Sequence, residues 1–189
     1  MKTEKIRTQL DRNEWVDGAI EALADEGMAG MRVEALAKRF GVTKGSFYWH
    51  FKDRQDLLNG VLQTWKEGRI RDIDKQSSAA PGKECDQLLQ VIDTYGTNRN
   101  QKGISIELAV RDWARRDTQA HLVVEEVDTY RLESTRKLFV ASGFSDNEAK
   151  SRSLLLYAYV FGQSLMAYDR YDPKIIDFKR WIAEHIVAN

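Results

Sequence analysis

The sequence has little cysteine, little proline and no net charge. Its 189 residues contain a single cysteine, Cys85, which excludes an internal disulfide, a thiolate zinc cluster and a redox pair. Only two prolines, Pro81 and Pro173, interrupt the chain, and this scarcity favours helices over the turn-rich layouts of all-β proteins. The content of 42% hydrophobic and 31% charged residues is typical of a globular protein and excludes a disordered chain.

Long apolar segments are also missing. The stretch 154–168 is fifteen residues long and free of charge, but it includes Gln163 and Ser164 and falls short of the ~20 apolar residues that a membrane span needs. It predicts a buried helix instead. The polar first nine residues do not have the apolar centre of a signal peptide, so we expect a cytoplasmic protein without membrane contact.

Apolar residues recur at helical spacing along most of the chain, and no stretch shows the sustained alternation of a half-buried strand. Together with the capping residues, this spacing predicts an all-α protein of roughly nine helices. In the N-terminal part we expect a first helix that Asn13 caps and that ends at Glu26, followed by a second helix that ends at Gly41. We expect Thr43 to cap a short third helix. Asp53 should cap a long fourth helix that reaches about Lys75. Beyond a linker-like stretch at 76–83, the expected boundaries are Thr118 and Ser142 for one helix, the capping box Ser145 to Glu148 for the next, and Asp172 with Pro173 at the start of the last.

Two short helices joined by Gly41-Val42-Thr43, after a longer first helix, have the pattern of a helix-turn-helix. Between Arg32 and Arg54, six basic residues stand against two acidic ones, so this segment carries +4 in a chain whose total charge is zero. Duplex DNA, with about one negative charge per 1.7 Å of its axis, suits such a segment. A solvated basic face of a helical bundle explains the charge count equally well.

The residue types of this segment also suit DNA. Thr43 and Ser46 offer hydroxyls, Tyr48 offers a phenol, and Lys44 can reach a guanine or a phosphate. Gly45 and Ser46 are small, which lets the start of the third helix approach the floor of a major groove about 12 Å wide.

Residues 15–62 closely resemble the DNA-binding domain of the tetracycline-repressor (TetR) family. The motifs that carry the resemblance are Val16-Asp-Gly-Ala19-Ile20, Glu26-Gly27, Val33-Glu-Ala-Leu36-Ala37, Gly41-Val42-Thr43-Lys44-Gly45-Ser46-Phe47-Tyr48-Trp49-His50-Phe51 and Leu57-Leu58. The chain departs from the family pattern at Arg32, where a threonine often caps the second helix, and at Arg54, where lysine is common. The departure at Arg32 affects the cap of the second helix, whereas arginine at position 54 keeps the positive charge that lysine would carry.

The resemblance implies an N-terminal helix-turn-helix domain over residues 1–56 and a C-terminal helical domain over 57–189 for dimerisation and ligand binding. It further implies that Lys44, Gly45 and Ser46 lie nearest the base edges of the DNA, while Phe47 and Phe51 belong to the core. The residues implied to contact the DNA backbone are Thr43, Tyr48, His50, Lys52 and Arg54. For Trp49 we expect a partial contact with DNA, with cover of the first helix as the alternative; a hydrogen-bonded surface histidine is the alternative for His50.

The eighth helix is apolar on all sides, which requires cover on all sides. Ala158 and Gly162 would allow a neighbouring helix to approach closely. We therefore expect a homodimer in which this helix and the preceding one, Thr118 to Ser142, form a four-helix interface. The interface residues expected on the eighth helix are Leu154, Ala158, Phe161, Gly162 and Leu165. The alternative is a central core helix of a monomer.

A ligand pocket has weaker support in the sequence. Aromatic residues from several helices would line an apolar cavity with a few hydroxyls, although aromatic residues at helical spacing also suit a plain core. These residues are Trp65, Tyr95, Trp113, Tyr130, Tyr157, Phe161 and Tyr168. Arg111, Arg115 and Arg116 would pair with an anionic ligand, although a solvated helix face also accounts for them.

The sequence thus predicts a DNA-binding transcriptional regulator, a repressor by expectation. It would bind a near-palindromic operator as a dimer and be released by a small molecule. A constitutive dimeric DNA-binding protein and a helical protein-interaction module without effector are the alternatives. An enzyme is the competing class, but the chain has no phosphate-binding glycine loop, no Gly-x-Ser-x-Gly and no His-Glu-x-x-His, and we expect neither a metal nor a cofactor.

Overall fold

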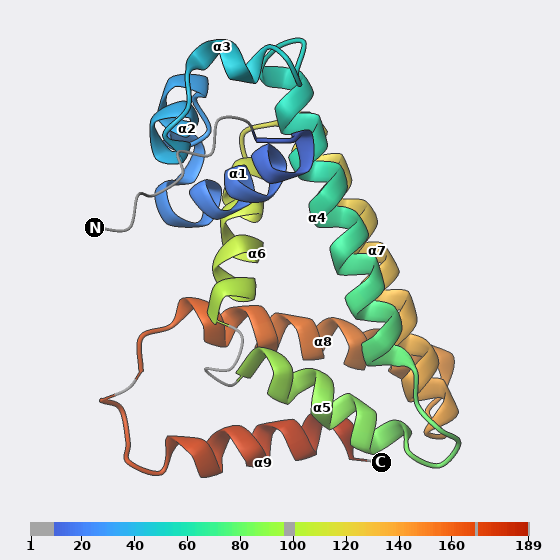
Figure 1. Cartoon of the computed structure of the whole chain (residues 1–189). Coiled ribbons are helices and arrows are strands. Elements are labelled where there is room, and N and C mark those ends of the chain that lie inside the picture. Colours follow the sequence, from blue (N-terminus) through green and yellow to red (C-terminus); the bar gives the residue numbers. More distant parts are fainter. Residues whose placement is uncertain (1–9, 97–100, 169, 189) are drawn as a thin grey trace, which may run out of the picture. The chain divides into compact units, whose positions relative to one another are not determined.

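The computed structural model describes residues 10–96, 101–168 and 170–188, and this part of the chain is helical without a strand (Figure 1). The α-helices are α1 (Arg12–Glu26), α2 (Val33–Phe40), α3 (Lys44–Phe47), α4 (Arg54–Ser77), α5 (Glu84–Gly96), α6 (Gln101–Ala114), α7 (Thr118–Ala141), α8 (Asp146–Leu165) and α9 (Ile175–Val187). A single 3-10 turn, η1 (Gly27–Ala29), follows α1. The expected all-α fold of roughly nine helices is confirmed, and none of the helices in the described ranges is long and apolar enough to cross a membrane.

The chain forms two compact units, which we describe separately. The first contains Met1–Gly68 and Ser105–Val124, and the second contains Arg69–Ile104 and Glu125–Asn189. Three helices, α4, α6 and α7, contribute residues to both units. The domain division that we expected, at residue 56, stays a prediction.

Aromatic packing holds the first unit together. The Trp15 side chain of α1 is fully buried, and its ring meets Phe40 of α2 and Phe47 of α3 edge to face, at centroid distances of 5.1 Å and 5.5 Å. Phe47 also stacks on Phe51 at 5.0 Å. Each aromatic pair adds about 0.5–1.5 kcal/mol to what burial of its area contributes. Phe47 and Phe51 are thus core residues, as the resemblance implied.

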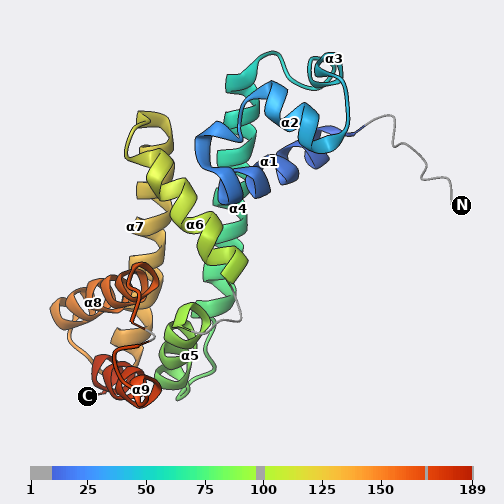
Figure 2. The ribbon, with the colours of Figure 1, turned by 90° about the vertical axis from the view of Figure 1, so that its left-hand side faces the viewer.

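The second unit is built around α5, α8 and α9, which pack against one another in pairs (Figure 2). Its core is mostly aliphatic, and Phe139 and Phe144 meet edge to face within it at 5.6 Å. On α8 the buried positions Leu156, Tyr157 and Val160 follow helical spacing.

Several caps agree with the sequence. Gly27 and Gly41 end their helices, and the Thr43 and Ser145 side chains accept hydrogen bonds from the backbone N–H groups three residues on. The capping box at Ser145 is only half formed, because the carboxylate of Glu148 bonds to Arg152.

Two expected caps were wrong. Asp11, not Asn13, caps α1, because Asp11 and Glu14 have the spacing of a capping box, and both of its hydrogen bonds are present, at 2.8 Å and 2.9 Å. The last helix begins at Ile175 rather than at Pro173, because the Asp172 carboxylate accepts from the N–H of Lys174 and closes a turn before the helix.

Substitution of Gly41 tests whether the turn between α2 and α3 requires a glycine. Its backbone is left-handed, with φ 68° and ψ 28°, so we expect Gly41→Ala to lower the free energy of unfolding by about 1 kcal/mol. The control is Gly45→Ala in α3, whose new methyl would make only an ordinary contact with Thr43 Oγ1 at 3.7 Å and should not lower stability. Urea unfolding of both variants measures the difference, and equal stabilities would contradict the strained turn.

Candidate DNA-binding surface

The turn into α3 is fixed by backbone hydrogen bonds. The N–H of Gly41 bonds to the carbonyl of Lys38, and the N–H of Val42 bonds to that of Ala37, which closes the end of α2. Thr43 Oγ1 then accepts from the N–H of Ser46 and caps α3. The start of α3 is therefore presented in one defined orientation relative to α2.

Every residue expected to contact DNA lies between positions 43 and 54 of the first unit, which we call the 43–54 surface. The exposed ones are Thr43, Lys44, Gly45, Tyr48, Trp49, Lys52 and Arg54, while Ser46 and His50 are partly buried. The Trp49 side chain is 81% exposed, which argues against the alternative in which it covers α1. A large exposed aromatic ring next to basic residues is free to stack on a sugar or a base.

Ion pairs within the protein already engage two of the basic side chains of the segment from Arg32 to Arg54. Lys44 forms an ion pair with Glu34 of α2, which lowers the pKa of that carboxyl and raises the pKa of the lysine. Arg39 bonds to Asp25 at 2.6 Å and to Glu26 at 3.0 Å, and these partners raise the pKa of Arg39. The Glu34 carboxylate therefore competes with DNA for the Lys44 ammonium.

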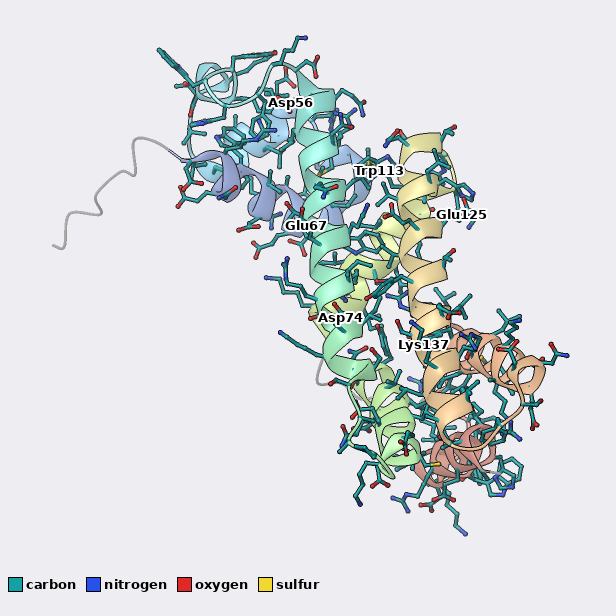
Figure 3. The ribbon with its side chains drawn as sticks, turned by 90° about the vertical axis from the view of Figure 1, so that its right-hand side faces the viewer. Asp56, Glu67, Asp74, Trp113, Glu125 and Lys137 are labelled. Carbon is teal, nitrogen blue, oxygen red and sulfur yellow. The ribbon has the colours of Figure 1, made fainter. Side chains whose placement is uncertain are left out.

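Arg12 is a positioning residue that the sequence reasoning missed. Its guanidinium bonds to Asp56 of α4 at 2.7 Å, donates to the carbonyl of His50 at 2.6 Å and lies 4.3 Å over the ring of Phe51. Asp56, labelled near the start of α4 in Figure 3, also accepts from the N–H of Lys52, and the bond from Arg12 lowers the pKa of its carboxyl. Arg12 thus connects α1, the segment after α3 and the start of α4. The only signal in the sequence was a basic residue at the start of a helix.

The environments of His50 and Arg54 narrow their possible contacts. Nε2 of His50 is buried without a hydrogen-bond partner, so the ring must turn before this atom can meet a phosphate. Nε of Arg54 donates to the carbonyl of Met31 at 3.0 Å, which holds this exposed side chain at the start of α4.

The residues expected to line a ligand pocket are divided between the two units. Trp65 and Trp113 are buried and belong to the first unit, whereas Tyr95, Tyr157 and Phe161 pack together in the second. The ring of Tyr130 is 40% exposed, and its hydroxyl donates to Asp74 of α4, whose position Figure 3 labels. Tyr168 is partly buried, with the ammonium of Lys179 4.9 Å from the centre of its ring.

Four of the five residues expected at a dimer interface lie on the side of α8 that faces away from its buried positions, whereas the ring of Phe161 packs against Tyr95 and Tyr157. Leu154, Ala158 and Leu165 are exposed, whereas Phe161 and Gly162 are half-buried. A Cβ atom added at Gly162 would meet nothing within 4 Å, so the chain leaves space at this position.

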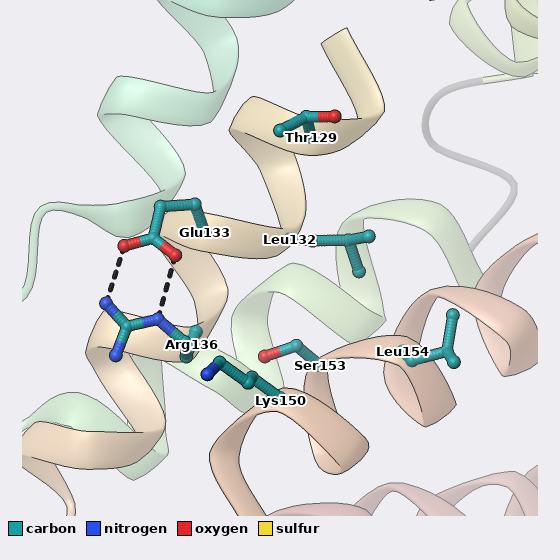
Figure 4. Close-up of a pocket in the computed structure, with 7 residues that line it drawn as sticks. All are labelled: Thr129, Leu132, Glu133, Arg136, Lys150, Ser153 and Leu154. Atoms are coloured by element: carbon teal, nitrogen blue, oxygen red, sulfur yellow. Dashed lines mark hydrogen bonds and ion pairs between the residues drawn. The ribbon is translucent and has the colours of Figure 1, made fainter. Parts of the chain in front are cut away.

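A surface groove of about 340 Å³ lies between α7 and α8 (Figure 4). Its charged lining residues are Glu133, Arg136 and Lys150. Arg136 bonds to Glu133 and to Asp146, and Lys150 pairs with Asp146 as well. Both cations of the groove therefore have acidic partners of their own.

Comparisons with known proteins agree on one family. Residues 16–61 match the model of "Bacterial regulatory proteins, tetR family". The chain is 32% identical to the class A tetracycline repressor protein from transposon 1721 of Escherichia coli over 84% of its own length and 67% of that protein's. It is 25% identical to the HTH-type transcriptional regulator AcrR of Shigella flexneri over 96% and 88%. In structure it resembles Salmonella enterica GusR, with a TM-score of 0.69, 13% identity and coverage of 94% and 95%.

The Lys44–Glu34 pair generates a prediction about sequence preference. If Lys44 contacts a base, Lys44→Ala should relax the preference for particular sequences and cost about 1–3 kcal/mol of binding free energy. Lys52→Ala should weaken binding to all sequences alike. Glu34→Gln removes the carboxylate that competes for Lys44, so it should strengthen binding to unrelated duplexes. The charge-matched control is Asp17→Asn, at an exposed position of α1.

Selection from random duplexes, followed by titration of each variant, provides the measurement. Identical sequence profiles for Lys44→Ala and Lys52→Ala would show that Lys44 does not contact the bases.

Proposed function

This chain belongs to the tetR family of bacterial regulatory proteins, and from that premise we propose which residues bind DNA, how two copies assemble and what releases them. The protein is a DNA-binding transcriptional regulator, like the relatives that it matches along most of its length. We propose that it acts as a repressor rather than as an enzyme. The observation that carries the proposal is a short helix, fixed by buried Phe47, with an exposed basic and aromatic surface around it.

The 43–54 surface divides into two kinds of contact. Lys44, Gly45 and Ser46 at the start of α3 would lie along the base edges in the major groove. The backbone contacts would come from Thr43, Tyr48, Lys52 and Arg54, with His50 added if its ring turns, and Trp49 would stack on a sugar. All of these residues except Ser46 and His50 are exposed, which supports their assignment to DNA contacts. The hydrogen bond from Arg54 to the carbonyl of Met31, which holds this side chain in place, supports it too.

A dimer would be formed through α8. Six residues, all small or apolar, share the side of this helix that faces away from its buried positions: Leu154, Leu155, Ala158, Gly162, Leu165 and Met166. Leu154 and Leu165 are 62% and 72% exposed, and a contiguous apolar face of this kind marks an interaction site. Two copies related by a two-fold axis would bury it.

The second helix of the interface is α9 in this proposal, instead of the expected α7. The helix α9 packs on α8, and one of its sides carries Phe178, Trp181 and His185, with the ring of Trp181 stacked on that of His185. Trp181 is 59% exposed. The exposed apolar side chains of α7 within the second unit, Tyr130 and Val140, are each 40% exposed.

An effector would bind in the second unit and weaken DNA binding. The helix α4 contributes its first residues to the unit of the 43–54 surface and its last ones to the other unit. A ligand that favours one arrangement of α4 would change the spacing of the two α3 helices in the dimer. A coupling of about 1–3 kcal/mol corresponds to a 5- to 150-fold change in operator affinity, and DNA must weaken the ligand by the same factor.

The alternatives differ in measurable ways. A constitutive dimeric binder would show no coupling between any bound compound and the operator, and a protein-interaction module would not bind duplex DNA. A thermal-shift screen, followed by operator titration with each compound found, distinguishes these functions.

Operator selection tests the DNA-binding proposal. We expect selected duplexes to be near-palindromic, with half-site centres one helical turn, about 34–36 Å, apart or somewhat more. Affinity should fall steeply with salt, by about 0.9 units of log–log slope for each neutralised phosphate. An affinity that stays flat between low and physiological salt would contradict the phosphate contacts.

Gly162→Arg tests the assembly. The space beside Gly162 lets the folded chain accept the side chain, whereas a two-fold contact would force two cations into close approach. We expect a folded monomer with at least tenfold weaker operator binding, and an unchanged dimer for Gln90→Arg on the exposed side of α5. Sedimentation and circular dichroism measure both, and a monomeric wild-type protein at micromolar concentration would refute the dimer.

A further inference from the structure

One acidic side chain lies beside the start of α3, the helix that is proposed to enter the DNA groove. The segment from Arg32 to Arg54 contains two acidic residues. Asp53 caps α4, since its carboxylate accepts from the N–H of Asp56 at 2.9 Å. Glu34, the second residue of α2, instead forms an ion pair with Lys44, the first residue of α3. Glu34 thus brings a negative charge to the edge of the 43–54 surface.

The core of the first unit fixes the two helices that carry this pair. The helices α2 and α3 pack against each other, and Leu36 of α2 and Phe47 of α3 are fully buried. The left-handed backbone of Gly41 turns the chain between them. The starts of α2 and α3 are therefore held in place by buried residues and by the turn, so the ion pair has a preformed position on the surface.

Both members of the pair are open to solvent. The side chains of Lys44 and Glu34 are 51% and 67% exposed, and Nζ of the lysine lies 2.5 Å from Oε1 of the carboxylate. The hydrogen bond between them lowers the pKa of the Glu34 carboxyl and raises the pKa of the Lys44 ammonium, so both groups stay charged near neutral pH. Water screens such a pair, so it adds little to the stability of the fold. The pair thus presents a donor and an acceptor side by side to a ligand.

The major-groove edge of a G·C base pair is complementary to this arrangement. Guanine presents two neighbouring acceptors, N7 and O6, and cytosine presents the N4 amino donor next to O6. A Watson–Crick hydrogen bond of about 2.9 Å joins N4 to O6, which is comparable with the 2.5 Å between the lysine nitrogen and the carboxylate oxygen. An ammonium has three donors and a carboxylate about four acceptor positions, so each group can contact a base while the two remain paired.

We propose that Glu34 and Lys44 together recognise one G·C base pair in each half-site, with the lysine donating to guanine and the carboxylate accepting from N4 of cytosine. An A·T pair would satisfy them less well, because its amino group has one acceptor on either side instead of two adjacent ones on the same side. The inference rests on the proposed DNA-binding function. It adds a specificity residue on α2 that was not among the expected DNA contacts.

The same carboxylate would weaken binding to unrelated DNA. Phosphate oxygens are acceptors only, so a phosphate attracts Lys44 and repels Glu34. A G·C pair offers a donor to the carboxylate as well as acceptors to the ammonium. Glu34 would therefore increase the difference between specific and non-specific binding in two ways, by a contact with cytosine and by repulsion of the backbone.

Selection from random duplexes with the wild-type protein and with three variants tests the contact. Glu34→Ala should lose the preference for G·C at one position of each half-site and keep the preferences at the other positions, and Lys44→Ala should lose it at the same position. The matched control is Asp17→Ala, which removes an exposed carboxylate of α1 in the same unit and should change no preference. All three side chains are exposed, so the variants should fold, and circular dichroism checks this.

Modified bases at the selected position test the contact without any change to the protein. In N4-methylcytosine a methyl group replaces the major-groove proton that Glu34 would accept, so wild-type affinity should fall by about tenfold or more. The affinity of Glu34→Ala should change by less than about twofold. Inosine in place of guanine removes the minor-groove amino group but keeps N7 and O6, so it serves as the control and should affect the two proteins alike.

Three results would each overturn the inference: a G·C preference that Glu34→Ala retains, selection of A·T at the position that depends on Glu34, and equal effects of N4-methylcytosine on the wild-type protein and Glu34→Ala. With any of these results, sequence-selective binding by the wild-type protein would still support the proposed function. Failure of the wild-type protein to select any duplex would overturn the proposed function together with this inference.

Discussion

The position of α3 depends on the burial of one side chain, Phe47. A helix of four residues is not stable on its own, because its few hydrogen bonds do not offset the ordering of its backbone. Phe47 anchors it between Trp15 of α1 and Phe51, while the residues around Phe47 remain exposed. The same short segment therefore supplies an anchor to the core and a surface that can enter a DNA groove.

Ion pairs with carboxylates determine how much of the basic charge of the first unit is available to DNA. Lys44 and Arg39 have carboxylate partners within the protein, and Arg12 uses its charge to join α1 to Asp56. Water screens exposed pairs of this kind, so phosphates can replace the carboxylates at low cost. DNA binding is in this sense an exchange of partners, in addition to a release of counterions.

The helix α8 serves the two proposed tasks of the second unit from opposite sides. Tyr157 and Phe161 approach Arg131 on the inner side, while Leu154 and Leu165 remain exposed on the outer side. A helix is a rigid element, so a ligand that displaces the inner residues also displaces the outer ones. In a dimer joined through α8, occupancy of one subunit would then alter the contact with the other.

The sequence by itself determined the helices, most of their ends and the family, because helical spacing, capping residues and the run from Gly41 to Phe51 are local properties. It misplaced the start of α1, where Asp11 and Asn13 are both capping residues, and the start of α9, where the Asp172 carboxylate closes a turn before the helix. Tyr95, Tyr157 and Phe161 were among the seven aromatic residues that it indicated for a pocket, but it did not indicate Arg131, since a buried arginine on a helix is indistinguishable from a solvated one until other helices cover it. Only the tertiary structure decided which charges are paired, which aromatic rings meet and which side of α8 stays exposed, because each depends on contacts between residues far apart in the chain.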